Sequence, residues 1–187
     1  GQRPSTTTLL VRAVAATLRS HELLMATLVN DSEVVVGNSI DIGVAVETEE
    51  SMIMVPVVRQ ADEQPLPVLN AALADLIERA RSRRIMPDEL SGGVFTITNY
   101  GVFGADFGTP IISPRQTAIL GVGRFQQRPL WLDGRIRPRW VTYFSLTYDH
   151  RVIYGGPAAR FLADLEIAFT RLGEWAGVAD DKRDAKP

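Results

Sequence analysis

The chain has 187 residues, of which 45% are hydrophobic and 22% are charged, and this composition predicts one globular domain with a sizeable core. Its 20 basic and 22 acidic residues give a net charge of -2, which argues against nucleic acid as a partner. Cysteine is absent, which excludes a disulfide framework, a thiolate metal site and a cysteine nucleophile and makes a reducing cytoplasm the expected compartment.

Apolar runs in the chain are short. None approaches the roughly 18 residues that a membrane span needs. The beginning of the chain also lacks the apolar stretch of a signal peptide. We therefore expect no membrane partner.

The first elements are predicted to be a helix and two strands. Apolar residues recur at helical spacing from Thr8 to Leu18. Runs of β-branched residues at 34–36 and 42–46 are separated by Gly37-Asn38-Ser39. This pattern predicts two strands joined by a turn.

The middle of the chain is predicted to hold an edge strand and a second helix. The apolar run 52–58 reads as a strand, and Pro56 confines it to an edge or a bulge because proline cannot donate to the ladder. Apolar spacing from 71 to 80, followed by a basic stretch, predicts the helix. Residues 87–90 resemble a further helical turn.

The last part alternates in the manner of strands until a final helix. Strands are expected at 94–98, at 116–122 and along 140–148, with a hairpin turn at Asp133-Gly134. A helix is expected from Pro157 to Leu172. This order of elements predicts a two-layer α/β domain with helices on one side of a mixed sheet.

His150 lies between the last predicted strand and the last predicted helix. An imidazole has a reference pKa of about 6.5, which suits it to take a proton from a thiol or a hydroxyl. Taken alone, a histidine at a strand end is more often structural. We expect burial at this turn to disfavour the protonated ring. His21, the other histidine, follows the first helix in a polar context and is expected at the surface.

A second signal is the stretch 92–104, a strand with hydroxyls on one face that opens into a glycine-rich loop. No Gly-Lys-Ser/Thr follows and no helix opens after the glycines, which argues against a nucleotide cradle. A hydroxyl at the strand end can instead donate to a developing oxyanion. With two histidines and no cysteine, no metal site is expected.

Several motifs in the right order resemble one family. Gly93–Gly104 and Pro110–Gly123, with Asp149–Ile153 and Ala158–Leu162, are similar to the catalytic domain of the dihydrolipoyl acyltransferases. These are the core components of 2-oxo acid dehydrogenase complexes. Two earlier strands, 42–46 and 55–59, match as well, so the resemblance spans nearly the whole chain.

The resemblance implies a two-layer, mixed-sheet α/β fold of the chloramphenicol-acetyltransferase-like type. It implies a homotrimer with active sites in channels between subunits, which can assemble into a larger core. Residues 1–175 would be the acyltransferase catalytic domain, without the N-terminal part of the family domain. Residues 176–187 form a polar tail whose end is predicted to be disordered.

The reaction implied is acyl transfer between a dihydrolipoyl thiol and coenzyme A. His150 matches the family's general base, and Thr98 stands where a serine or threonine of the neighbouring subunit stabilises the oxyanion. The remaining expected site residues are a supporting loop of Asp149, Tyr154 and Gly155, and a substrate-binding set of Asn99, Phe103 and Phe107.

The resemblance implies no metal and no cofactor held within this domain. The lipoyl group, carried on an upstream domain absent from this chain, and coenzyme A would be substrates. The expected partners are the 2-oxo acid decarboxylase/dehydrogenase and dihydrolipoyl dehydrogenase components, in the cytoplasm or the mitochondrial matrix. An apolar pocket from Phe103, Phe107 and Ile111 mildly favours a branched-chain acyl group.

The chain departs from the family at Tyr154. The family's pattern is His-x-x-x-Asp-Gly, in which the aspartate pairs with an arginine and holds the turn, and tyrosine cannot be that carboxylate. We therefore expect reduced activity. Two alternatives remain open: a free-standing acetyltransferase of the chloramphenicol type that acts on a small hydroxyl, and a non-catalytic assembly scaffold with a decayed site.

Overall fold

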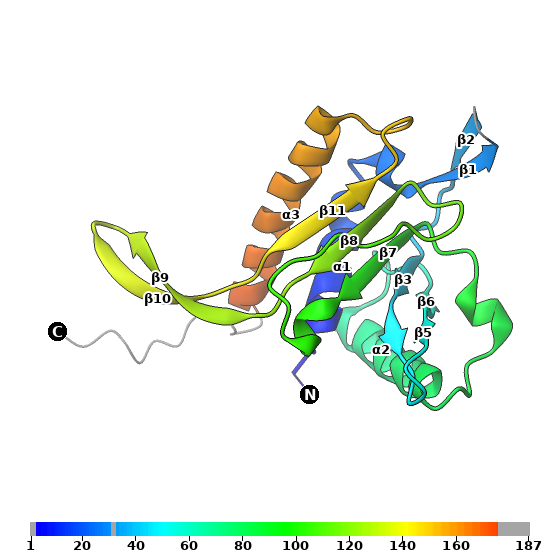
Figure 1. Cartoon of the computed structure of the whole chain (residues 1–187), viewed down its shortest axis with the longest axis horizontal. Helices are drawn as coiled ribbons and strands as arrows, with labels where there is room; N and C mark the ends of the chain where they lie inside the picture. Colours follow the sequence, from blue (N-terminus) through cyan, green and yellow to red (C-terminus); the bar gives the residue numbers. More distant parts are fainter. Residues whose placement is uncertain (1–2, 31–32, 176–187) are drawn as a thin grey trace.

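A five-stranded mixed sheet forms the centre of the chain in the computed structural model, which describes residues 3–30 and 33–175 (Figure 1). The strands lie in the order β11-β8-β7-β3-β6. Their bounds are Phe144–Tyr148 for β11, Ala118–Val122 for β8, Phe95–Asn99 for β7, Ile42–Val44 for β3 and Val57–Val58 for β6.

The three central strands, β8, β7 and β3, run parallel, and the two edge strands are antiparallel to their neighbours. All five residues of β8 are buried, as expected for a strand that has neighbours on both sides. The prediction of a mixed sheet is therefore confirmed.

Three helices cover one face of the sheet, which confirms the predicted two layers (Figure 1). Helix α1 spans Thr6–Leu18, α2 spans Leu66–Arg81 and α3 spans Gly155–Trp175. Ser5 caps α1 by accepting a hydrogen bond from the Thr8 amide. Phe161 of α3 is fully buried with its ring 5.8 Å from that of Phe95, so α3 is packed directly against β7.

Short elements surround this core. Three 3₁₀ turns are η1 at Glu22–Met25, η2 at Pro87–Leu90 and η3 at Tyr100–Phe103. Three antiparallel strand pairs lie outside the main sheet. They are β1 (Ala26–Asn30) with β2 (Glu33–Val36), β4 (Val46–Glu47) with β5 (Ile53–Met54), and β9 (Gln126–Leu132) with β10 (Arg135–Val141).

The β9–β10 hairpin projects away from the rest of the chain (Figure 1). Its turn is at Asp133-Gly134, as predicted, and both residues have positive φ angles. In the register of the pair, Trp131 stands opposite Ile136, and Trp140 lies on the same face four residues later. All three side chains are more than half exposed.

Strand pairing was predicted wrongly near the beginning. The segment 34–36 was expected to pair with 42–46, but β2 pairs with β1, a strand that the sequence pattern does not indicate. Strand β3 instead lies between β7 and β6. A local turn signal cannot reveal this, because the partners of β3 are non-local.

Two predicted strands are each interrupted. The run 52–58 divides into β5 and β6 around Pro56, whose carbonyl accepts from the Val44 amide, and β6 is an edge strand as predicted. The run 140–148 divides at Thr142-Tyr143, where the Tyr143 carbonyl accepts from Gly123. The chain leaves the hairpin there and enters the main sheet.

Two helices begin earlier than predicted. Helix α2 starts at Leu66, with Pro67 in its first turn, and α3 starts at Gly155. In the described residues, no helix combines the length and apolar character that a membrane crossing requires. The polar tail 176–187 lies outside the described residues, so its disorder stays a prediction.

Candidate active site

His150 lies in the turn between β11 and α3, as the sequence predicts. The backbone of Asp149 fixes this turn: its amide donates to the Thr117 carbonyl (2.8 Å), and its carbonyl accepts from Val152 (3.0 Å) and Ile153 (2.9 Å). The Ile153 side chain is fully buried and anchors the turn in the core. His150 is therefore attached to a rigid part of the fold.

An ion pair within the turn adds to this support. The Asp149 carboxylate accepts from the Arg151 amide (2.9 Å) and from its guanidinium Nη2 (2.7 Å). The Asp149 side chain is only 16% exposed. The hydrogen bonds from Arg151 hold the pKa of Asp149 below its ordinary value.

Two tyrosine rings flank the imidazole of His150. The ring of Tyr148, the last residue of β11, is 5.7 Å away with a tilt of 34°. The ring of Tyr154 is 5.6 Å away and meets it edge-on at 83°. His150 itself is exposed in the single chain. The burial expected for the imidazole is therefore not provided by one chain and stays a prediction for the assembled protein.

His21 is not the surface residue that the sequence predicts. Its side chain is 10% exposed, and its Nε2 lies 2.8 Å from a carboxylate oxygen of Asp164 on α3. Its ring also contacts the edge of Phe161 at 5.5 Å. The local pattern could not reveal this, because Asp164 lies 143 residues further along the chain.

Thr98 is near the end of β7, and its register partner on β8 is Gly121. Its side chain is half-buried, like that of Asn99, the last residue of the strand. Thr96, two residues earlier on the same face, is buried and donates to Gln116 (2.7 Å). The hydroxyl of Thr96 is therefore already used in a structural hydrogen bond. The hydroxyl of Thr98 has no hydrogen-bond partner within residues 3–30 and 33–175.

The loop that follows Thr98 is held at its base but exposed along its length. An added Cβ at Gly101 would lie 2.3 Å from the Arg124 amide, so only glycine allows this close approach to the segment that follows β8. Asp106 accepts from Arg124 and from Gln126 (3.0 Å) at the start of the hairpin. Phe103 and Phe107 are 66% and 75% exposed. The expected apolar pocket is therefore not formed by one chain.

Thr98 and His150 lie at opposite ends of the sheet. In the register, Thr98 is next to Gly121, and Gly121 is next to Ser145 of β11. From Ser145, β11 continues for three residues to Tyr148, roughly 10 Å at about 3.3 Å per residue, and His150 lies in the turn beyond that end. One copy of the chain does not bring the two residues together.

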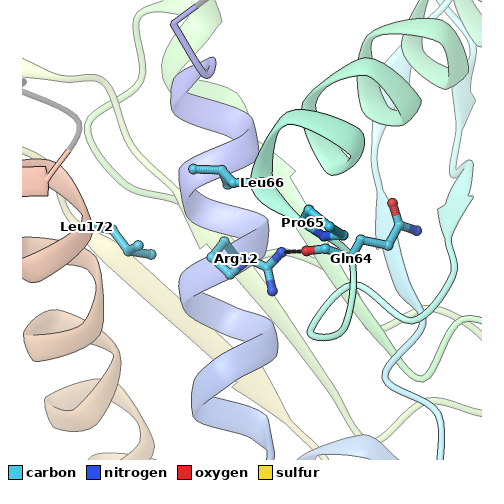
Figure 2. A pocket seen from close by; sticks show the side chains of 5 residues that line it. All are labelled: Arg12, Gln64, Pro65, Leu66 and Leu172. Atoms are coloured by element: carbon cyan, nitrogen blue, oxygen red, sulfur yellow. Dashed lines mark hydrogen bonds between the residues drawn. The ribbon is translucent and has the colours of Figure 1, made fainter. Parts of the chain in front are cut away.

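A cavity on the helical face is lined by neither residue. It has a volume of about 390 Å³ and is lined by Arg12, Gln64, Pro65, Leu66 and Leu172 (Figure 2). The Arg12 guanidinium already donates to the carbonyls of Asp62 and Gln64. Burial lowers the pKa of Arg12. The cavity contains no nucleophile or general base. In the described part of the chain, acidic and histidine side chains form no group of three or more that could hold a metal ion.

Residues 1–174 match the family model described as 2-oxoacid dehydrogenases acyltransferase (catalytic domain). The chain is 39% identical over 159 residues to the mitochondrial succinyltransferase component of the Bos taurus 2-oxoglutarate dehydrogenase complex, covering 84% of this chain and 35% of that protein. It is 42% identical over 175 residues to the acetyltransferase component of the Mycobacterium tuberculosis pyruvate dehydrogenase complex, covering 90% and 31%. The chain thus spans about a third of the length of these curated relatives.

Solved structures agree with the sequence relatives. Azotobacter vinelandii dihydrolipoamide acetyltransferase, in which the catalytic roles of a serine, a histidine and an asparagine have been investigated, superimposes with a TM-score of 0.85 at 34% identity. The match covers 91% of this chain and 70% of that one. The cubic core of a pyruvate dehydrogenase multienzyme complex matches equally well.

Chloramphenicol acetyltransferase, with a TM-score of 0.55 at 14% identity over 88% of this chain and 78% of that one, shares the fold, as predicted. The family match covers nearly the whole sequence, and the fold superimposes on solved acyltransferase cores. The chain belongs to the 2-oxoacid dehydrogenase acyltransferase family, of which it represents the catalytic domain.

Proposed function

We propose that this chain transfers an acyl group between a dihydrolipoyl thiol and coenzyme A within a 2-oxo acid dehydrogenase complex. One observation carries the assignment of its residues. The serine and histidine investigated in the Azotobacter vinelandii enzyme are 52 residues apart, and its asparagine follows four residues after the histidine. The same two spacings separate Thr98, His150 and Tyr154 here.

His150 serves as the general base. A thiol with a reference pKa of about 8.5 is only a few per cent ionised at neutral pH, so a nearby imidazole that accepts its proton increases the reactive thiolate. The coenzyme A thiolate then attacks the carbonyl carbon of the acyl-lipoyl thioester. A carbon–sulfur bond forms, and the carbonyl oxygen becomes an oxyanion.

Thr98 stabilises this tetrahedral intermediate. Its hydroxyl, which has no partner in the described part of the chain, donates to the oxyanion. When the intermediate collapses, the bond to the lipoyl sulfur breaks. The departing thiolate takes the proton from His150, so that the base returns to its starting form. Asp149 and Gly155 support the turn, and Asn99 lies beside Thr98 in the substrate channel.

The active unit is a homotrimer in which each site takes His150 from one copy and Thr98 from the next. Their positions at opposite ends of the sheet support this proposal, because a second copy must supply the missing half. The exposed face of Trp131, Ile136 and Trp140 on the hairpin is a suitable contact surface. The similarity to a cubic core supports further assembly of trimers into a larger particle.

The acyl group is proposed to be branched and apolar. Phe103, Phe107 and Ile111 follow Thr98 on the exposed loop, where a second copy can close them into a pocket. Turnover with isobutyryl-, acetyl- and succinyl-coenzyme A tests this proposal. A branched chain should be used fastest, and faster use of succinyl-coenzyme A would contradict an apolar pocket.

The partners are the 2-oxo acid decarboxylase/dehydrogenase and dihydrolipoyl dehydrogenase components. The compartment is the cytoplasm, or the mitochondrial matrix in a eukaryote. The relatives support this range, because they include a mitochondrial protein and bacterial ones.

Incubation with an acyl-coenzyme A and dihydrolipoamide tests the function. We expect turnover that falls by about 10³-fold in His150→Ala, within the range for loss of a general base. His21→Gln, which changes the other histidine, should retain most of the turnover. Absence of turnover in the wild type would favour the assembly scaffold. Acylation of a small alcohol alone would favour the free-standing acetyltransferase.

The molar mass in solution tests the trimer. Trp131→Glu with Trp140→Glu should shift the protein from trimer to monomer in light scattering coupled to size exclusion, because two charges would replace the apolar contact. Val68→Glu, on an exposed position of α2, is the control and should remain trimeric. A wild-type monomer at micromolar concentration would contradict the proposal.

A further inference from the structure

The environment of His150 contains aromatic rings in place of a carboxylate. In the described part of the chain, His150 forms no ion pair and no hydrogen bond through its side chain. Its side-chain ring contacts are those with Tyr148 and Tyr154, at centroid distances of 5.7 Å and 5.6 Å. Both distances fall inside the range of roughly 4.5–7 Å at which aromatic pairs attract each other.

The two rings restrict the imidazole in different ways. Tyr148 is tilted by 34° relative to it, whereas Tyr154 meets it at 83°, close to a T-shaped pair. Contacts at two such different angles limit rotation about both side-chain bonds of the histidine. The ring of Tyr148 and the backbone of Tyr154 are themselves held in place. Tyr148 is half-buried against the core, and the Tyr154 carbonyl accepts from the Ala158 amide in the first turn of α3.

The backbone of the turn does not depend on residue 154. Asp149 and Arg151 supply an ion pair inside the turn, and Ile153 anchors it. An aspartate at position 154 would therefore add a negative charge beside the imidazole without being needed to hold the loop. A neutral ring orients the base without favouring its protonated form.

We propose that Tyr148 and Tyr154 form an aromatic bracket that orients the His150 imidazole, and that Tyr154 is a positioning residue for the acyl transfer. Only the expected changes in kcat and KM rest on the proposed function. It replaces the expectation that Tyr154 weakens the site. The ring of Tyr154, and not its hydroxyl, performs this role.

Two measurements on the same variants test the bracket. The first is the ring-proton chemical shifts of His150, which are easily assigned because the chain has two histidines and His21→Gln removes the other. The second is kcat and KM for coenzyme A. Tyr154→Phe keeps the ring, Tyr154→Leu keeps apolar bulk, Tyr154→Ala removes both and Tyr154→Asp restores the family's carboxylate. Tyr154 is 65% exposed, so these variants should fold.

We expect Tyr154→Phe to keep the ring-current shift of His150 and a kcat within about twofold of wild type. Tyr154→Leu, Tyr154→Ala and Tyr154→Asp should lose the part of the shift that Tyr154 contributes and lower kcat about tenfold, with KM for coenzyme A unchanged. A higher kcat in Tyr154→Asp, equal losses in Tyr154→Phe and Tyr154→Ala, or an unchanged shift in Tyr154→Ala would each overturn the bracket.

The two proposals can fail separately. A wild type without turnover contradicts the proposed function, while the chemical shifts still decide whether the rings orient His150. If the wild type turns over and Tyr154→Ala has the same chemical shifts and the same kcat, the proposed function is supported and the aromatic bracket is contradicted.

Discussion

The two ends of the five-stranded sheet are built differently. At the His150 end, backbone hydrogen bonds, the Asp149–Arg151 ion pair and the buried Ile153 complete the turn within one chain. At the Thr98 end, the strand leads into a loop with exposed Phe103 and Phe107. His150 is therefore positioned by the folding of one chain, whereas the loop after Thr98 leaves its aromatic side chains exposed, and in the proposed trimer a second copy covers them.

After the loss of about 10³-fold expected for His150→Ala, the largest effect is expected at the Thr98 end. Thr98→Ala should lower kcat by about 10²–10³-fold, as for removal of one oxyanion donor, with little change in stability because the side chain is only half-buried. Thr98→Ser keeps the hydroxyl and should retain most activity. If alanine and serine were equally active, the donor would have to lie elsewhere.

The next largest effect tests whether His150 of one copy and Thr98 of another form one site. Equal amounts of His150→Ala and Thr98→Ala chains, unfolded and refolded together, should recover about a quarter of wild-type turnover, because half of the copies supply each residue to a shared site. The same variants refolded separately and then mixed provide the control. No recovery in co-refolded trimers would mean that both residues act within one copy.

A smaller loss of turnover is expected when Ile153, which anchors the turn, is shortened. Ile153→Ala should lower the free energy of unfolding by about 2–5 kcal/mol, because it leaves a cavity at a fully buried site. It should also reduce kcat several-fold by loosening the turn. Denaturant unfolding and steady-state rates measure both effects. Val102→Ala, at a 72% exposed position of the opposite end, should leave stability nearly unchanged.

The smallest effect concerns pH. Because hydrogen bonds from Arg151 lower the pKa of Asp149, its stabilisation of the turn is present at neutral pH and is lost as the pH falls through that lowered value. Asp149→Asn should flatten the dependence of the melting temperature on pH below about 4. Glu89→Gln removes a carboxylate outside the turn whose pKa Arg79 lowers to about 2, so it should flatten the acid profile as well, without changing the turn. If the melting temperature of Asp149→Asn depended on pH in the same way as that of the wild type, the Asp149–Arg151 ion pair would not stabilise the turn.

Elements with a strong local period could be predicted from the sequence. Helix α1 and the hairpin turn at Asp133-Gly134 were correct because helical spacing and turn chemistry are local properties. The pairing of β2 with β1 was missed because pairing depends on distant partners. The break at Thr142-Tyr143 was missed because alternation continues while the chain changes from one sheet to another.

The candidate site also has features that could be predicted from the sequence and features that could not. His150 could be placed because a strand pattern and a helix pattern meet at that residue. Its exposure could not be predicted, since the sequence of one chain does not say which side of a turn a second copy covers. The tyrosine contacts also could not, because ring angles follow from the exact path of the turn.

The contact between His21 and Asp164 links residues that are 143 positions apart. During synthesis, the apolar surface of α1 remains uncovered until α3 has left the ribosome, because α3 provides the other wall of that packing. Completion of the core therefore waits for the synthesis of α3. Ribosome-stalled chains that end before α3 should accordingly be sensitive to protease and should bind chaperones.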